Sequence, residues 1–279
     1  MSDNWIVGNL QSAFHTWNDK LAEIWALITT TPQEFRGGGI WTAIVNINDG
    51  LQAVGYGLLV LFFAMGIFQS AASFRDFQRP EFALRHFIRF ILAKTAIGYG
   101  MELMLAIFNI CGGIVQSIMG GVGGMASAAV SVPQEMVDTI ESIGFLESIP
   151  LWLVTVLGSL FITILSFILI MTVYGRFFRL YMFTALAPLP LSSFAGEGTS
   201  FIGKTFIKSY TGVCLEGAVI VLACLIYTAF ISGSAPVLDT SLSAVTMSWQ
   251  YVGETIFNMI VLVGLVKGAE RIVKEMFGL

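Results

Sequence analysis

The chain has 279 residues, of which 56% are hydrophobic and only 11% are charged, and its mean hydropathy is +0.82. This composition lies outside the range of soluble globular proteins and predicts an all-α, polytopic integral membrane protein. The formal net charge of −4 says less than the placement of the charges, which are segregated along the chain. Cys111, Cys214 and Cys224 lie in apolar runs without CxxC spacing, so we interpret them as small core residues.

An amphipathic helix is predicted over residues 1 to 30, within an extracytoplasmic N-terminal segment of residues 1–39. At about 100° per residue one apolar stripe forms, and the polar face carries a single cation, Lys20. This helix therefore packs against the helical bundle or another subunit, or lies on the membrane surface without the usual basic face. The stripe consists of Leu10, Phe14, Trp17, Leu21, Ile24, Trp25 and Ile28.

The transmembrane domain is predicted to cover residues 40–279. Long uncharged or nearly uncharged runs of about 20 residues or more indicate spanning helices. We expect about five of them, near residues 50–74, 90–118, 148–175, 208–230 and 256–266.

A proline-broken segment follows the third of these spans. Pro188 and Pro190 each lack a backbone donor, and lipid offers no water to satisfy the groups that they leave unpaired. Cations flank the segment on both sides, with Arg176 and Arg179 before it and Lys204 after it. The pattern predicts a re-entrant segment over residues 180–203, with both of its ends on the cytoplasmic side.

The positions of the cations predict the topology. With five spans, 12 of the 14 Lys and Arg residues lie inside, and only Lys20 and Arg36 lie outside. All six tryptophans fall in segments placed outside. The positive-inside rule therefore predicts a multi-pass protein of the bacterial cytoplasmic membrane, with its N-terminus outside and its C-terminus in the cytoplasm.

One short motif resembles a phosphate-binding loop. Residues 198–205 read GTSFIGKT, which matches the GxxxxGK[ST] pattern. A phosphate loop needs a preceding strand and a sheet behind it, and this composition provides neither. We interpret Lys204 as an anchor at the lipid headgroups.

Glu102 and Glu216 are the acidic candidates within predicted spans. Each follows a cation by eight residues, which predicts a similar depth for both carboxylates. An intramembrane carboxylate must face the bundle interior, a partner or water. A structural role and a proton- or ion-coupled site are the two alternatives. A protonated Glu216 is a candidate partner for backbone groups freed near Pro188 and Pro190, whereas an ionised Glu216 needs a backbone donor or a cation such as Arg179.

Several runs carry a resemblance to a known family. They are FRDFQRPE (74–81), SIPLW (148–152), TVYGRFFRLYMFTALAPLPLSSFAGEG (172–198), KSYTGVCLEGAVIVLACLIY (208–227) and the ending FNMIVLVGLVKGAERIVKEMFGL. Together and in this order they resemble the TrbL-like conjugal transfer family, in the branch carried by integrative conjugative elements of Gram-positive bacteria. The resemblance implies a subunit of a type IV secretion apparatus that helps DNA or protein cross the cytoplasmic membrane, alongside other secretion subunits and separate ATPases.

The sequence therefore predicts a channel or scaffold subunit that is not an enzyme and uses no cofactor or metal. Contact with transferred DNA would be indirect, and a homo- or hetero-oligomer is expected. Small-residue spacings, Ala53 to Gly57 and Gly264 to Gly268, predict close helix packing within or between subunits. The alternative is a secondary transporter with a mid-membrane site around Glu102, Glu216 and the broken segment.

Overall fold

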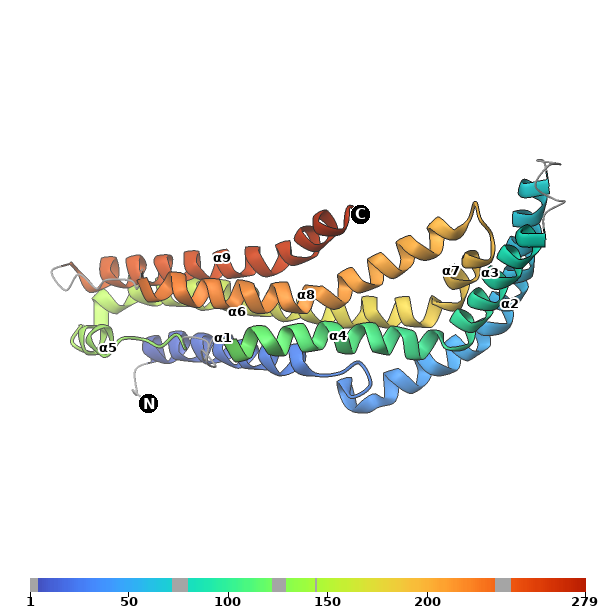
Figure 1. Ribbon diagram of the computed structural model, residues 1–279. Helices are drawn as coiled ribbons and strands as arrows, with labels where there is room; N and C mark the ends of the chain where they lie inside the picture. The colour runs from blue at the N-terminus through green and yellow to red at the C-terminus, as the bar shows by residue number, and fades with distance from the viewer. Residues whose placement is uncertain (1–4, 72–79, 122–128, 144, 234–241) are drawn as a thin grey trace. The chain divides into compact units, whose positions relative to one another are not determined.

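The computed structural model describes residues 5–71, 80–121, 129–143, 145–233 and 242–279, and within these ranges it contains helices and no strand (Figure 1). The predicted all-α class is confirmed. The elements are α1 (Trp5–Thr29), η1 (Phe35–Gly38), α2 (Gly39–Ala71), α3 (Pro80–Gly98), α4 (Gly100–Gly121), α5 (Gln134–Glu141), α6 (Phe145–Leu186), α7 (Pro188–Ser192), η2 (Ser193–Ala195), α8 (Ser200–Gly233) and α9 (Ala244–Phe277).

The helices form two compact units. The first comprises Met1–Thr29, Gln116–Tyr174 and Val219–Ala269, and the second comprises Thr30–Val115, Gly175–Ala218 and Glu270–Leu279. The long helices α6, α8 and α9 each contribute residues to both units.

In the first unit, α1 buries its apolar stripe against α6 and α9. The ring of Trp5 lies 5.8 Å from that of Trp152, and the ring of Phe14 lies 6.5 Å from that of Tyr251. Trp17 is fully buried, so it is a core residue and no interfacial anchor. Of the two placements open for this helix, the structure shows packing against the bundle. The buried residues of α1 are Ile6, Val7, Leu10, Ala13, Phe14, Trp17, Leu21, Ile24 and Ile28.

In the second unit, α3 runs antiparallel beside the later part of α2. Phe90 lies 4.9 Å from Phe63, while eight residues further along α3 the Cβ position of Gly98 lies 3.2 Å from the Tyr56 hydroxyl. The chain enters α2 through a tight turn in which Arg36 and two glycines have positive φ.

Among the described residues, four helices are long and apolar enough to span a membrane: Phe35–Gln69, Gly100–Gly120, Ser148–Leu186 and Ser200–Ile231. The sequence predicted about five, and the stretch at 256–266 within α9 is not among these four. The first helix starts well before residue 50, since α2 begins at Gly39, and within it Asn48 is buried and donates a hydrogen bond to the Thr184 carbonyl (2.7 Å). The span expected at 90–118 is divided, because the chain changes from α3 to α4 around Tyr99.

The third span, expected at 148–175 with a separate re-entrant segment at 180–203, belongs in the structure to a helix that continues to the prolines. Helix α6 continues through Gly175 to Leu186, so residues 180–186 are its last turns, and α7 begins at Pro188. The short helices α7 and η2 pack against α2 and α3 within the second unit. The break lies at the prolines because neither can donate to the preceding turn.

Candidate functional site

Two arginines near the end of α6 form the centre of the candidate site, in the second unit. Arg176 is only 2% exposed. Its Nε donates to the Val213 carbonyl (3.3 Å) and its Nη2 to the Cys214 carbonyl (3.2 Å), both on α8. Its guanidinium carbon also lies 5.9 Å from the ring centre of Phe108, within cation–π range. Arg176 therefore joins α6 to α8 through carbonyl groups, without a carboxylate in direct contact among the described residues.

Gly217 provides the space for this guanidinium. A Cβ at Gly217 would lie 2.8 Å from three atoms of the Arg176 head group. The two residues therefore fit together only while position 217 lacks a side chain. The sequence analysis did not identify Gly217, since nothing in the local pattern distinguishes it from the other helical glycines.

Arg179, one turn further along α6, connects three helices by ion pairs. Its Nη2 lies 2.6 Å from Glu216 Oε2 on α8, and its Nη1 lies 2.6 Å from Glu270 Oε2 on α9. Glu270 also pairs with Lys274 at 2.7 Å. The Glu216 side chain is 5% exposed, whereas Glu270 is 43% exposed. We call Arg176, Arg179, Glu216 and Glu270 the arginine cluster.

Glu216 therefore does not serve the proline-broken segment as the sequence suggested. Local serines satisfy carbonyl groups there: the Ser192 hydroxyl donates to Leu189 and the Ser193 hydroxyl donates to Pro190. Short i to i−3 bonds of this kind need no distant partner.

Glu102 is exposed on α4, and among the described residues it forms no ion pair. The similar depth expected for the two glutamates is not found. Tyr210 donates to the Met104 carbonyl (3.0 Å), so Tyr210 is the residue of α8 that lies near the level of Glu102, and Glu216 is six residues further along α8. The expectation assumed one straight helix from Lys94 through Glu102, whereas the chain changes helix at Tyr99.

The phosphate-loop resemblance falls on a helix. Ser200 begins α8, so Gly203, Lys204 and Thr205 are helical, and the Lys204 side chain is exposed. The Gly203 backbone N–H donates to the Ser193 hydroxyl (2.8 Å), which caps the helix. A phosphate-binding loop needs its backbone N–H groups turned toward a common centre after a strand, and this segment has another conformation.

Replacement of Lys204 by arginine is expected to leave subunit assembly and conjugal transfer unchanged. Either long cation reaches the headgroups from this exposed position, whereas an arginine fork does not fit a phosphate cradle built for lysine. Mating frequency and co-purification of the other subunits measure both properties. Saturable ATP binding that disappears in Lys204→Ala would contradict the anchor role.

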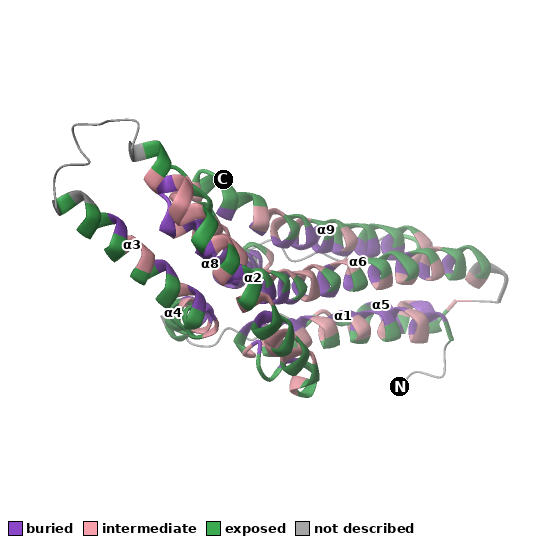
Figure 2. Cartoon of the chain, turned by 90° about the vertical axis from the view of Figure 1, so that its right-hand side faces the viewer, coloured by how far each residue is buried: buried purple, intermediate pink, exposed green. Residues whose placement is uncertain are grey.

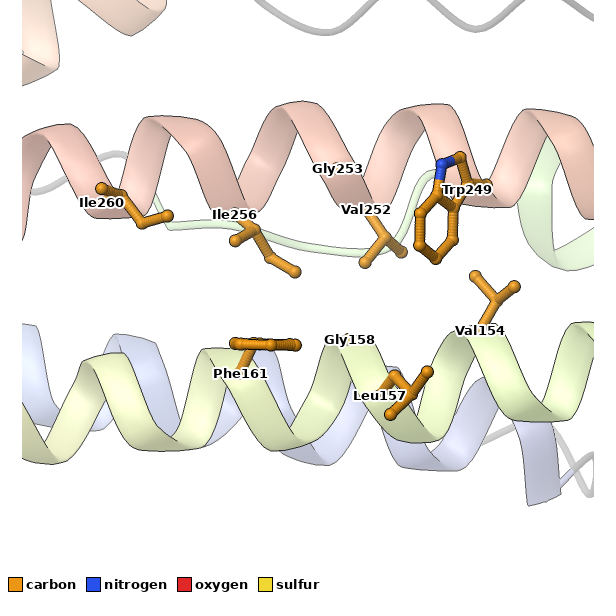
Figure 3. A pocket seen from close by; sticks show the side chains of 9 residues that line it. All are labelled: Val154, Leu157, Gly158, Phe161, Trp249, Val252, Gly253, Ile256 and Ile260. Carbon is orange, nitrogen blue, oxygen red and sulfur yellow. The ribbon is translucent and has the colours of Figure 1, made fainter.

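The first unit carries an apolar groove between α6 and α9, with a volume of about 230 Å³ (Figure 3). Gly158 and Gly253 form the parts of its wall without side chains. Gly158 faces Val252 so closely that a Cβ there would lie 2.5 Å from the valine Cγ1. The groove is lined by apolar side chains and holds no catalytic group. The side chains shown are Val154, Leu157, Phe161, Trp249, Val252, Ile256 and Ile260.

These features define a class of protein: an all-α integral membrane protein in which a partly buried cluster of charges joins the candidate spans α6 and α8 to α9. Comparison with known families agrees. The family described as TrbL/VirB6 plasmid conjugal transfer like protein matches residues 17–188, and the chain belongs to this family. It is thus a membrane component of conjugal transfer. No curated protein and no solved structure matches the chain.

The matched region ends at Pro188, the first residue of α7. It therefore includes Arg176 and Arg179 but not Glu216 or Glu270.

Proposed function

We propose that the protein is a non-enzymatic scaffold or channel subunit of a conjugative type IV secretion apparatus, which helps DNA or protein cross the cytoplasmic membrane. The observation that carries this proposal is the family match, together with the four candidate spanning helices. The arginine cluster supports a structural role, because Glu216 is fully engaged by Arg179 at 2.6 Å.

The length of α6 exceeds what one crossing of the membrane needs. Its candidate span, Ser148–Leu186, has 39 residues, which corresponds to about 58 Å, whereas a hydrocarbon core is about 30 Å thick. A helix of this length crosses the core with residues to spare, so α6 extends beyond the core at one end or at both.

Thiol labelling of intact cells is expected to separate two positions. A cysteine at Ser131, which is exposed, reacts with an impermeant reagent from outside, and one at Glu197, which is also exposed, does not. The three native cysteines are buried and are replaced in the background. Strong outside labelling at position 197 would contradict the topology. Ser193 is unsuited as a second inside position because it is buried, and Ser241, expected outside, lies beyond the described residues.

Deletion and complementation test the proposed function. Deletion of the gene is expected to abolish mating, and a plasmid-borne copy of the wild-type gene is expected to restore mating. Co-purification of the remaining subunits from the deletion strain then distinguishes the two roles. If the protein is a scaffold, the remaining subunits do not assemble without it. If it is a channel subunit, they still form a core complex, but this complex cannot transfer substrate. Normal mating in the deletion strain would contradict both. Uptake of a solute by the purified chain alone would favour the transporter alternative.

A further inference from the structure

Helix α3 presents a broad apolar face to the outside of its unit (Figure 2). The side chains on this face are between 46% and 61% exposed. At about 100° per residue they share one side of the helix. They are Leu84, Phe87, Ile88, Ile91 and Leu92. One acidic residue, Glu81 in the first turn of α3, lies on the same side, at the N-terminal end of the face.

The opposite face of α3 is held inside the second unit, so the orientation of the helix is fixed. His86, Ala93 and Ile97 are buried. Arg89 also points inward, where its Nη2 lies 3.1 Å from Glu197 Oε1. This hydrogen bond holds the pKa of Glu197 below its usual range, so the carboxylate stays ionised and is occupied by Arg89.

Two further cations border the apolar face. Arg85 lies at one edge and Lys94 at the other, by their angular positions on the helix. Both are exposed, and Arg85 is only distantly paired, at 3.9 Å from Glu197. Lys94 has no ion pair among the described residues. These two cations are therefore available to an external anion on either side of an apolar surface.

We propose that the outer face of α3 binds an anionic phospholipid, with its acyl chains on the apolar residues and its phosphate held by Arg85 or Lys94. Helix α3 itself is not a candidate span, but it packs on α2, which is one. Exposure of five large apolar side chains to water is unfavourable, whereas lipid covers them at no such cost. Long cations at the edges reach the headgroups while their stems cover apolar surface. This inference does not rest on the proposed role in secretion.

The test uses the purified full-length chain in a mild detergent, with the midpoint of thermal unfolding followed as lipid is added. Phosphatidylglycerol is expected to raise the midpoint at a lower concentration than phosphatidylcholine does. Substitution R85Q together with K94Q is expected to weaken the response to phosphatidylglycerol about fivefold for each cation removed. The response to phosphatidylcholine stays unchanged, and the pair R85K and K94R keeps the preference.

The matched control is R271Q, which removes one exposed cation from α9 and leaves α3 intact. Equal responses of the wild type to the two lipids would overturn the proposal, as would an unchanged preference in R85Q with K94Q. If R271Q loses the preference for phosphatidylglycerol to the same extent, the effect is one of general charge, and this result would also overturn the proposal. Stabilisation by soluble glycerol phosphate alone would show a small-anion site instead of a lipid-binding face. Phosphatidylglycerol that stays with the wild type through gel filtration, but not with R85Q and K94Q, would support the proposal independently.

Discussion

Replacement of Arg179 by methionine is expected to lower the free energy of unfolding by about 3 to 5 kcal/mol, the usual effect of breaking a buried ion pair by removing one partner. Glu216, whose side chain is 5% exposed, would lose its 2.6 Å partner and stay buried without one. The loss therefore reflects the carboxylate left behind more than the bond itself. Thermal or denaturant unfolding of the purified chain in detergent measures it.

The control for this variant is Arg271→Met. Arg271 pairs with Glu275 at 2.8 Å, but both side chains are exposed, at 85% and 64%. Its removal is expected to change stability by less than about 1 kcal/mol, since exposed pairs contribute little. An Arg179→Met effect no larger than that of Arg271→Met would contradict the structural role of the cluster.

Two further variants distinguish the charge from the shape. Glu216→Gln keeps an acceptor for Arg179 and is expected to be milder than Arg179→Met. The double variant Arg179→Met with Glu216→Met removes both charges and is expected to recover part of the lost stability, because a buried pair can be replaced by apolar groups at little cost. If the loss of stability in the double variant equals the sum of the losses in the two single variants, Arg179 and Glu216 do not interact.

Gly55→Ala is expected to destabilise the protein by about 1 to 3 kcal/mol through overpacking. A Cβ at Gly55 would lie 2.9 Å from the Pro188 carbonyl oxygen and 3.0 Å from the Pro188 Cβ. Backbone and ring atoms cannot turn away as a flexible side chain can. The added methyl group must therefore push α2 away from α7, and the midpoint of thermal unfolding in detergent falls.

Gly57→Ala provides the matched control, two residues further along the same helix. A Cβ at Gly57 meets nothing within 4 Å, and the position is exposed. Alanine is about 1 kcal/mol more favourable than glycine in a helix, so the control is expected to be neutral or stabilising. The structure therefore requires that Gly55→Ala lowers the free energy of unfolding and that Gly57→Ala does not. A neutral Gly55→Ala would show that α2 and α7 are not in close contact.

Several parts of the fold could be predicted because they depend on local patterns. The period of the apolar residues places α1 and its buried face, and the missing donors of Pro188 and Pro190 end α6. Composition alone predicts the helical membrane class. Burial of Cys111, Cys214 and Cys224 likewise follows from their apolar surroundings.

The rest depends on contacts between distant segments, which no local pattern encodes. The sequence around Asn48 does not show that this side chain is buried, because its hydrogen-bond partner, the Thr184 carbonyl, is distant in sequence. The small-residue spacings at Ala53 to Gly57 and Gly264 to Gly268 were expected to pack helices together within or between subunits. Within the chain the three glycines among them have open space around them, and the close approach is made at Gly55. Packing between subunits at these positions stays a prediction. Glu270, an exposed residue near the chain end, gave no sign that it shares Arg179 with Glu216.

The double engagement of Arg179 also fixes the rotational phase of the C-terminal helix. A turn of α9 by one residue moves a side chain by about 100° around the axis, which would carry Glu270 away from the guanidinium. Only one azimuth of α9 brings this carboxylate to an arginine already held by Glu216. Any movement of the last turns must therefore either take α6 and α8 along as one body or begin by releasing Glu270, the more exposed of the two carboxylates.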